Sequence, residues 1–140
     1  MLKDTPSPIE DVAPAIGPIR VLVVDDHVIV RNGLEQLLET VQGMELVGFA
    51  ADGSQAVTAV EEQAPDVVLM DLSMPVMDGV EATRRILAEN PEQRIVVLTS
   101  FADQRRVIEA IDAGANGYIL RDAAPEALLD AIRAAAQGGA

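Results

Sequence analysis

The stretch VVLMDLSMPVMDGVEA, residues 67–82, decides the fold of this chain. Four apolar residues precede Asp71, a pattern typical of a strand that is covered on both faces and ends in a polar side chain. In the loop that follows, Pro75 stiffens the backbone and Gly79 allows a turn that closes before the next helix. The stretch therefore predicts a buried strand that presents Asp71 at one edge of a parallel sheet.

Short apolar runs and segments of helical period alternate on both sides of this stretch. The runs predict strands at residues 21–24, 45–50, 67–70, 95–98 and 118–120. The other segments predict helices at residues 28–40, 54–63, 80–89, 103–113 and 125–136. Strict alternation implies right-handed crossovers and a parallel sheet with helices on both faces. We therefore predict a single doubly wound α/β domain over residues 19–137, after a poorly ordered leader, residues 1–18, that has no periodicity.

Composition narrows the class of function. A formal net charge of −13 argues against direct contact with nucleic acid, because clustered Lys and Arg meet the phosphate backbone. The 140 residues include no cysteine, which excludes disulfides and zinc–thiolate sites. The sequence shows neither a signal peptide nor an apolar stretch of membrane-spanning length. We therefore expect a cytoplasmic protein with no membrane partner.

Polar side chains follow four of the predicted strands. The residues concerned are Asp25, Asp26, Asp71, Thr99, Ser100 and Arg121. In parallel α/β sheets the carboxyl ends of the strands meet at one edge, where binding sites form. Three carboxylates at one edge would repel one another unless they shared a cation. Mg²⁺ (or Mn²⁺) suits an open cluster of oxygen ligands, to which the Ser73 backbone carbonyl can add another.

The same groups suit the transfer of a phosphoryl group. Asp71 would be the nucleophile, a carboxylate that forms an acyl phosphate. The metal, the Thr99 hydroxyl and the Arg121 guanidinium would each bind one phosphoryl oxygen. We therefore predict that Asp71 accepts a phosphoryl group with the help of a divalent metal.

The motifs of this chain resemble those of the receiver domains of bacterial response regulators. The DD pair at 25–26, D-x-x-M-P-x-M-D-G at 71–79, T-S at 99–100 and Y-x-x-R at 118–121 match in order and spacing. The resemblance covers residues 20–136. DDHVIVRNGL and GYILRDA further resemble the NarL/LuxR-like subgroup. The resemblance implies a flavodoxin-like (βα)5 fold whose central sheet has the strand order 2-1-3-4-5.

The resemblance also implies how the acidic residues act. Asp71 is the expected phosphoacceptor. The expected metal ligands are Asp26, the Asp71 carboxylate and the Ser73 backbone carbonyl. Asp25 is expected to support the metal site. His27 stands beside the acidic pair, but we do not expect it to be a ligand because Mg²⁺ prefers oxygen.

Three further residues are expected to respond to the phosphoryl group. The resemblance implies that the Thr99 hydroxyl moves toward that group and that the Tyr118 ring follows, so that both form the switch. Ser100 is small, as access to the phosphoryl site requires. Arg121 departs from the family pattern, which has a lysine there. Arginine keeps the charge and can bind phosphate through two nitrogens, but its guanidinium is longer and planar.

The implied function is that of a signalling switch in a two-component phosphorelay. The implied partner is a sensor histidine kinase, and we expect at most slow self-dephosphorylation rather than enzymatic turnover. DNA would be bound only through a C-terminal helix-turn-helix domain, with residues 138–140 at the start of the linker to it. A homodimer is expected either at the face that contains residues 103–113, the last strand and the last helix, or through the first and last helices.

Two other functions share part of this pattern. A pseudo-receiver would act by protein contact without phosphorylation, with Arg121 as a permanent mimic of the activated cation arrangement. A phosphatase of the haloacid-dehalogenase type would also use an aspartate nucleophile and Mg²⁺. That class resembles D-x-D, whereas Ser73 stands at the position of the second acid here, so no general acid follows Asp71.

Two residues near the site have structural interpretations. Asp78 precedes a predicted helix and is expected to be a turn residue or helix cap. Met70 is expected in the core rather than in a metal-binding cluster of methionines.

Overall fold

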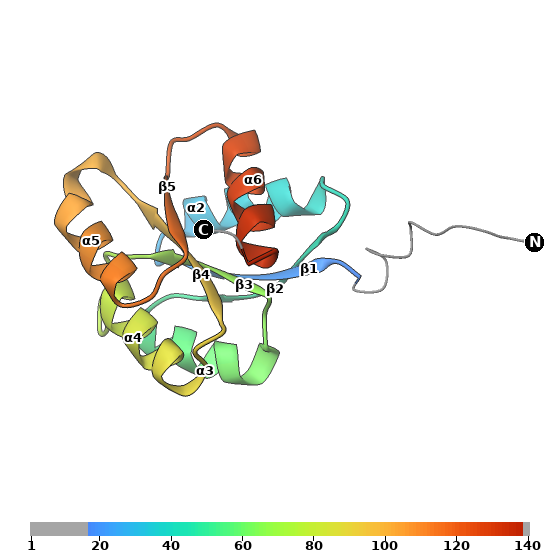
Figure 1. Cartoon of the computed structure of the whole chain (residues 1–140). Coiled ribbons are helices and arrows are strands. Elements are labelled where there is room, and N and C mark those ends of the chain that lie inside the picture. The colour runs from blue at the N-terminus through green and yellow to red at the C-terminus, as the bar shows by residue number, and fades with distance from the viewer. Residues whose placement is uncertain (1–16, 139–140) are drawn as a thin grey trace, which may run out of the picture.

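The computed structural model describes residues 17–138, and the expectations for the leader and for the linker lie almost entirely outside these residues. Within this range, five strands alternate with five α-helices and one short 3-10 helix (Figure 1). The strands are β1 (Ile19–Val24), β2 (Met44–Ala50), β3 (Val67–Asp71), β4 (Arg94–Thr99) and β5 (Gly117–Leu120). The helices are α2 (Val28–Glu39), α3 (Gly53–Gln63), α4 (Gly79–Glu89), η2 (Phe101–Asp103), α5 (Gln104–Asp112) and α6 (Pro125–Ala136).

The strands form one parallel sheet in the order β2-β1-β3-β4-β5. The predicted fold class and strand order are therefore confirmed. All ten predicted elements are present, and no end differs from the prediction by more than two residues. The short η2 turn was not predicted, and it takes the first residue of the predicted fourth helix.

Helices cover both faces of the sheet (Figure 1). Val21 and Val23 point to the face that α2 and α6 cover, whereas Leu22 and Val24 point to the face that α3, α4 and α5 cover. This alternation follows from the two-residue period of a strand. β3 lies at the centre and is buried at every residue, so Asp71 ends a strand that is packed on both sides. Met70 belongs to this core, as predicted.

The carboxyl ends of the strands meet at one edge of the sheet. Asp25 follows β1, Asp71 ends β3, Thr99 ends β4 and Arg121 follows β5. The edge predicted to carry the site is therefore the one that gathers these side chains. In residues 17–138, none of the helices has the length and apolar character that a bilayer crossing requires.

Candidate functional site

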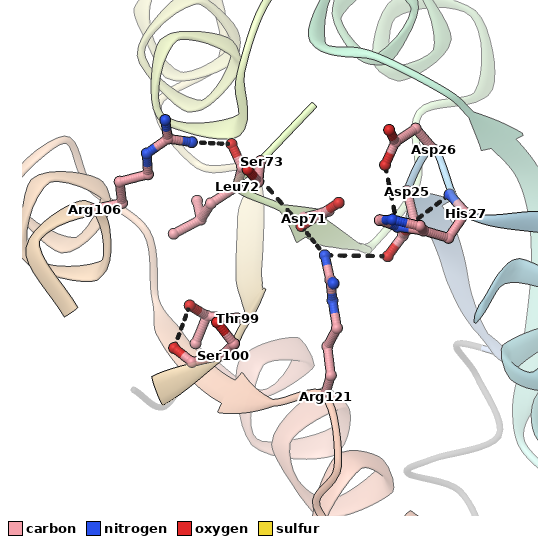
Figure 2. Close-up of polar contacts among 10 residues, drawn as sticks. All are labelled: Asp25, Asp26, His27, Asp71, Leu72, Ser73, Thr99, Ser100, Arg106 and Arg121. Carbon is pink, nitrogen blue, oxygen red and sulfur yellow. Dashed lines mark hydrogen bonds and ion pairs between the residues drawn. The ribbon is translucent and has the colours of Figure 1, made fainter. Parts of the chain in front are cut away.

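Four side chains cluster at the ends of β1 and β3 (Figure 2). One ligand atom from each of Asp25, Asp26, His27 and Asp71 lies within 4.8 Å of the others. Asp25 is 0% exposed and Asp71 1% exposed, whereas the Asp26 side chain is partly open to solvent. Neighbouring strands thus bring together the three predicted carboxylates, and they add the His27 ring.

Three carboxylate oxygens in this cluster make no hydrogen bond within the described part of the chain. They are Asp25 Oδ2, Asp26 Oδ1 and Asp71 Oδ2, and all are buried. Buried charged oxygens are costly unless a cation or donor meets them. A hard divalent ion supplies that charge and binds oxygen. These residues therefore fit Mg²⁺ or Mn²⁺, as the sequence predicted, with Asp26 as the most accessible of the carboxylates.

Arg121 places a guanidinium between the two most buried carboxylates (Figure 2). Its Nη2 donates to Asp71 Oδ1 and lies 3.8 Å from Asp25 Oδ2. The side chain is 31% exposed, so it reaches the cluster from solvent rather than from the core. Arg121 therefore reaches the predicted phosphoacceptor despite its departure from the family's lysine.

The environment of Asp71 favours its neutral form. Burial, with the nearby charge of Asp25, raises the pKa of the Asp71 carboxyl from 3.8 to about 6. The Arg121 guanidinium and the Ser73 backbone N–H, which lies 3.3 Å from Asp71 Oδ1, act in the opposite direction. The Arg121 charge therefore offsets only part of the cost of burying the Asp71 carboxylate beside Asp25.

His27 contacts the acidic pair more closely than the sequence suggested. Its backbone N–H donates to Asp25 Oδ1 at 2.9 Å, and its ring Nδ1 lies 2.9 Å from the same oxygen and 3.2 Å from Asp26 Oδ1. The hydrogen bond with Asp25 and the charge of Asp26 raise the pKa of the imidazole. These contacts orient Asp25 Oδ1 toward His27 and leave Oδ2 to face Asp71 and Arg121.

The predicted switch residues lie beside the acidic cluster rather than in it. Thr99 is buried, and its hydroxyl donates to the Ser100 carbonyl at 3.2 Å. Tyr118 is 58% exposed. Thr99, Ser100 and Tyr118 line a largely apolar groove of about 460 Å³, together with Leu120 and one side of α5. We refer to it below as the α5 groove, whose α5 residues are Gln104, Val107, Ile108, Ile111 and Asp112.

The loop behind Asp71 is held by contacts that the sequence only partly revealed. Asp78 caps α4 and accepts a hydrogen bond from the Glu81 N–H at 2.9 Å, as predicted. The Leu72 carbonyl accepts from the Gly79 N–H at 3.0 Å and from Arg106 Nη1 at 3.2 Å. No motif marks Arg106, because its contact depends on how α5 packs beside the loop.

Val76 occupies a strained position in this loop. It has a φ of 68° and is 85% exposed, and the Met77 N–H donates to the Pro75 carbonyl at 2.7 Å across it. This is a γ-turn with positive φ, which is rare, and a β-branched residue is a backbone outlier there.

We expect Val76→Gly to raise the free energy of unfolding by about 1 kcal/mol, because glycine adopts this backbone without the steric cost. Urea unfolding monitored by circular dichroism measures the change. Val76→Ala is the matched control, since it removes most of the side chain but keeps a Cβ, and it should give little of the gain. Equal gains in both variants would show that the exposed side chain, and not the backbone, carries the cost.

The sequence and fold match known proteins along most of the chain. Residues 21–133 match the family model for the response regulator receiver domain. The chain is 48% identical over 120 residues to the transcriptional regulatory protein LiaR of Bacillus subtilis, which covers 86% of this chain and 57% of LiaR. The chain thus spans little more than half the length of this relative.

Solved structures give the same result. A two-component response regulator of the LuxR family from Aurantimonas sp. SI85-9A1 superposes with a TM-score of 0.82 at 37% identity, over 88% of both chains. The signal receiver domain of the response regulator NarL from Mycobacterium tuberculosis superposes with a TM-score of 0.82 at 30% identity, over 87% of this chain and 98% of that domain. The chain belongs to the response regulator receiver domain family, and its similarities lie with regulators of the NarL/LuxR-like type.

Proposed function

We propose that this domain is a phosphoacceptor switch in which Asp71 takes a phosphoryl group from a sensor histidine kinase. The observation that carries the proposal is the buried Asp71 carboxylate, which lies among two further aspartates and contacts the Arg121 guanidinium. Each of the three aspartates has one buried oxygen that accepts no hydrogen bond from the described residues, which supports a divalent cation beside Asp71. The family supports the kinase as donor.

The transfer step would use the groups that surround Asp71. One Asp71 carboxylate oxygen forms a bond to phosphorus, while the bond from phosphorus to the donor imidazole nitrogen breaks and its electron pair stays on that nitrogen. Bound by Asp26, Asp71 and the Ser73 carbonyl, with Asp25 in support, Mg²⁺ would neutralise charge on the phosphoryl oxygens. Arg121 already contacts Asp71, so its guanidinium is placed to donate to those oxygens.

The switch would then use Thr99 and Tyr118. The Thr99 hydroxyl can exchange the Ser100 carbonyl for a phosphoryl oxygen by a rotation of its side chain. Ser100 is small and exposed, which leaves the phosphoryl site open. Thr99 and Tyr118 line the same groove, and we propose that the Tyr118 ring follows the shift of Thr99. The phosphorylated state would thereby change the surface around α5 and β5.

The output would be the control of transcription by a cytoplasmic regulator. The similar LiaR is a transcriptional regulatory protein, and this chain corresponds to about half of it. DNA would be bound by a helix-turn-helix domain C-terminal to these residues, and homodimerisation would accompany phosphorylation. The domain itself would not turn over substrate. We expect a long-lived acyl phosphate, because the side chains of Ser73 and Phe101 carry no carboxylate that could activate water.

The intact mass after incubation with Mg²⁺ and acetyl phosphate tests the proposal. We expect wild type to gain the mass of one phosphoryl group and Asp71→Asn to gain none, because the amide is not a nucleophile for phosphorus. Omission of Mg²⁺ should slow the gain at least about tenfold.

One result would favour a pseudo-receiver instead. The specific observation for that alternative is that Arg121, and not a lysine, contacts Asp71. If wild type binds Mg²⁺ but gains no mass, and Arg121→Lys does gain it, the arginine prevents phosphorylation in this chain. The domain would then act through protein contact alone.

A further inference from the structure

Arg106 joins the helix of the α5 groove to the loop behind the proposed phosphoacceptor. Its Nη1 donates to the Leu72 carbonyl at 3.2 Å across 34 residues of sequence (Figure 2). Leu72 follows Asp71 directly and is 0% exposed, and Arg106 is half-buried. The bond therefore ends on a backbone group that cannot move without the Asp71 backbone.

The Leu72 carbonyl is clamped from two sides. It also accepts from the Gly79 N–H at 3.0 Å, so α4 and α5 together use both lone pairs of this oxygen. Gly79 itself packs so closely on the backbone of Asp71 and Leu72 that a Cβ could not fit there. The loop therefore cannot move toward α4 without a steric clash. A displacement at Asp71 must consequently be passed to Arg106 or must break its hydrogen bond.

The helix that carries Arg106 is weakly anchored elsewhere. Ala110 is the one buried residue among the nine of α5, whereas α4 buries five of its eleven. Helices with few buried apolar contacts open locally at low cost, and one hydrogen bond then makes up a larger share of their attachment. Gln104 and Val107, which lie close to Arg106 on α5, line the α5 groove together with Ile108, Ile111 and Tyr118. A change in the Arg106 contact would therefore alter the groove wall.

We propose that Arg106 is a positioning residue that couples the loop behind Asp71 to α5, as a link separate from Thr99 and Tyr118. The state of the acidic site sets the position of α5 through the Leu72 carbonyl. By thermodynamic reciprocity, whatever fixes α5 in one position also changes the affinity of the acidic site for its ligands. Only the response to phosphorylation rests on the function proposed above, because the Arg106–Leu72 hydrogen bond involves no group of the acidic site.

The first arm of the test needs no metal. Hydrogen exchange in EDTA is measured for wild type, Arg106→Gln, Arg106→Lys and Arg105→Gln. We expect Arg106→Gln to speed exchange about fivefold in both α5 and the 72–79 loop, with β1 and β3 unchanged. Lysine keeps the charge and a donor and should restore part of the protection. Arg105→Gln removes the same charge from the preceding residue of α5, which is exposed, and this variant should match wild type.

The second arm measures the coupling itself. Mg²⁺ with beryllofluoride, which mimics a bound phosphoryl group, is added to each variant. We expect the α5 amides of wild type and Arg105→Gln to change their exchange at least about threefold, and those of Arg106→Gln to lose most of that response. The loop around Asp71 should respond in all variants, because its ligand groups are intact.

The two arms separate the two proposals. If Arg106→Gln leaves exchange in the 72–79 loop and in α5 as in wild type, or if Arg105→Gln gives the same effect, the coupling role of Arg106 is refuted whatever the metal does. If wild type shows no response to Mg²⁺ and beryllofluoride at Asp71, the phosphoacceptor function fails, and the first arm still decides whether Arg106 links the loop to α5.

Discussion

Gly79→Ala should lower the free energy of unfolding by about 3 kcal/mol, one of the largest losses that a single methyl group can cause in this domain. A Cβ at Gly79 would overlap the Asp71 carbonyl oxygen and lie 2.8 Å from the Leu72 Cα. Both contacts are with backbone, so no side-chain rotation can relieve them. Either α4 or the end of β3 must shift.

Urea unfolding followed by circular dichroism measures this loss. Gly33→Ala is the matched control, because Gly33 lies within α2 and an added Cβ would meet nothing within 4 Å. Alanine forms helix more readily than glycine, so that variant should gain about 1 kcal/mol. A loss of less than about 1 kcal/mol in Gly79→Ala would mean that the chain relaxes around the methyl group, and the loop would then not be as tightly clamped as its contacts suggest.

Asp71→Asn should make the metal-free domain more stable at neutral pH, by about 2 kcal/mol. Folding raises the pKa of the Asp71 carboxyl from 3.8 to about 6. A raised carboxyl pKa means that the folded state binds the proton more tightly than the unfolded state. Below about pH 4 the carboxyl is protonated in both states and costs no stability. The free energy of unfolding then falls as the pH rises toward 6, because folding must bury the charged form. The neutral amide avoids that loss, although it leaves Arg121 without its charged partner.

Unfolding in EDTA at about pH 5 and about pH 7.5 measures the effect. The difference between Asp71→Asn and wild type should be larger at the higher pH. Mg²⁺ should then stabilise wild type and have little effect on the variant, because the carboxylate that it neutralises is gone. Asp122→Asn, which removes an exposed acid, should stay within about 0.5 kcal/mol of wild type. A variant less stable than wild type at both pH values would show that the Arg121 contact outweighs the burial of the charge.

The fold was predictable because the apolar runs of the central strands β1, β3 and β4 indicate their burial. Apolar runs such as Val67 to Met70 favour a buried central strand, and the alternation with helices favours a parallel sheet. Asp71 could be placed for the same reason, since it follows such a run directly. These features depend on the pattern of neighbouring residues, which can be read directly from the sequence.

Three features outside the recognised motifs or their strand-end positions were not predictable. Arg106 and Leu72 are 34 residues apart, and neither belongs to a motif that implies the other. The closeness of the His27 ring to Asp25 depends on a rotamer, which no spacing rule fixes. The strained backbone of Val76 is equally hidden, because the sequence predicts a turn there but not its sign of φ. Such features depend on packing geometry rather than on residue pattern.

The first and last described residues lie near the amino ends of the strands, at the edge of the sheet opposite the acidic site. Gly17 and Gln137 line one open pocket with Ile19 and Arg94, the residues at which β1 and β4 begin. A neighbouring module spliced to either end would stand clear of the surface that a phosphodonor must approach. Because the two ends lie close together, the domain is suited to insertion into an exposed loop of an unrelated host protein. A conformational change at the acidic site would then be transmitted to the host through the two points of insertion.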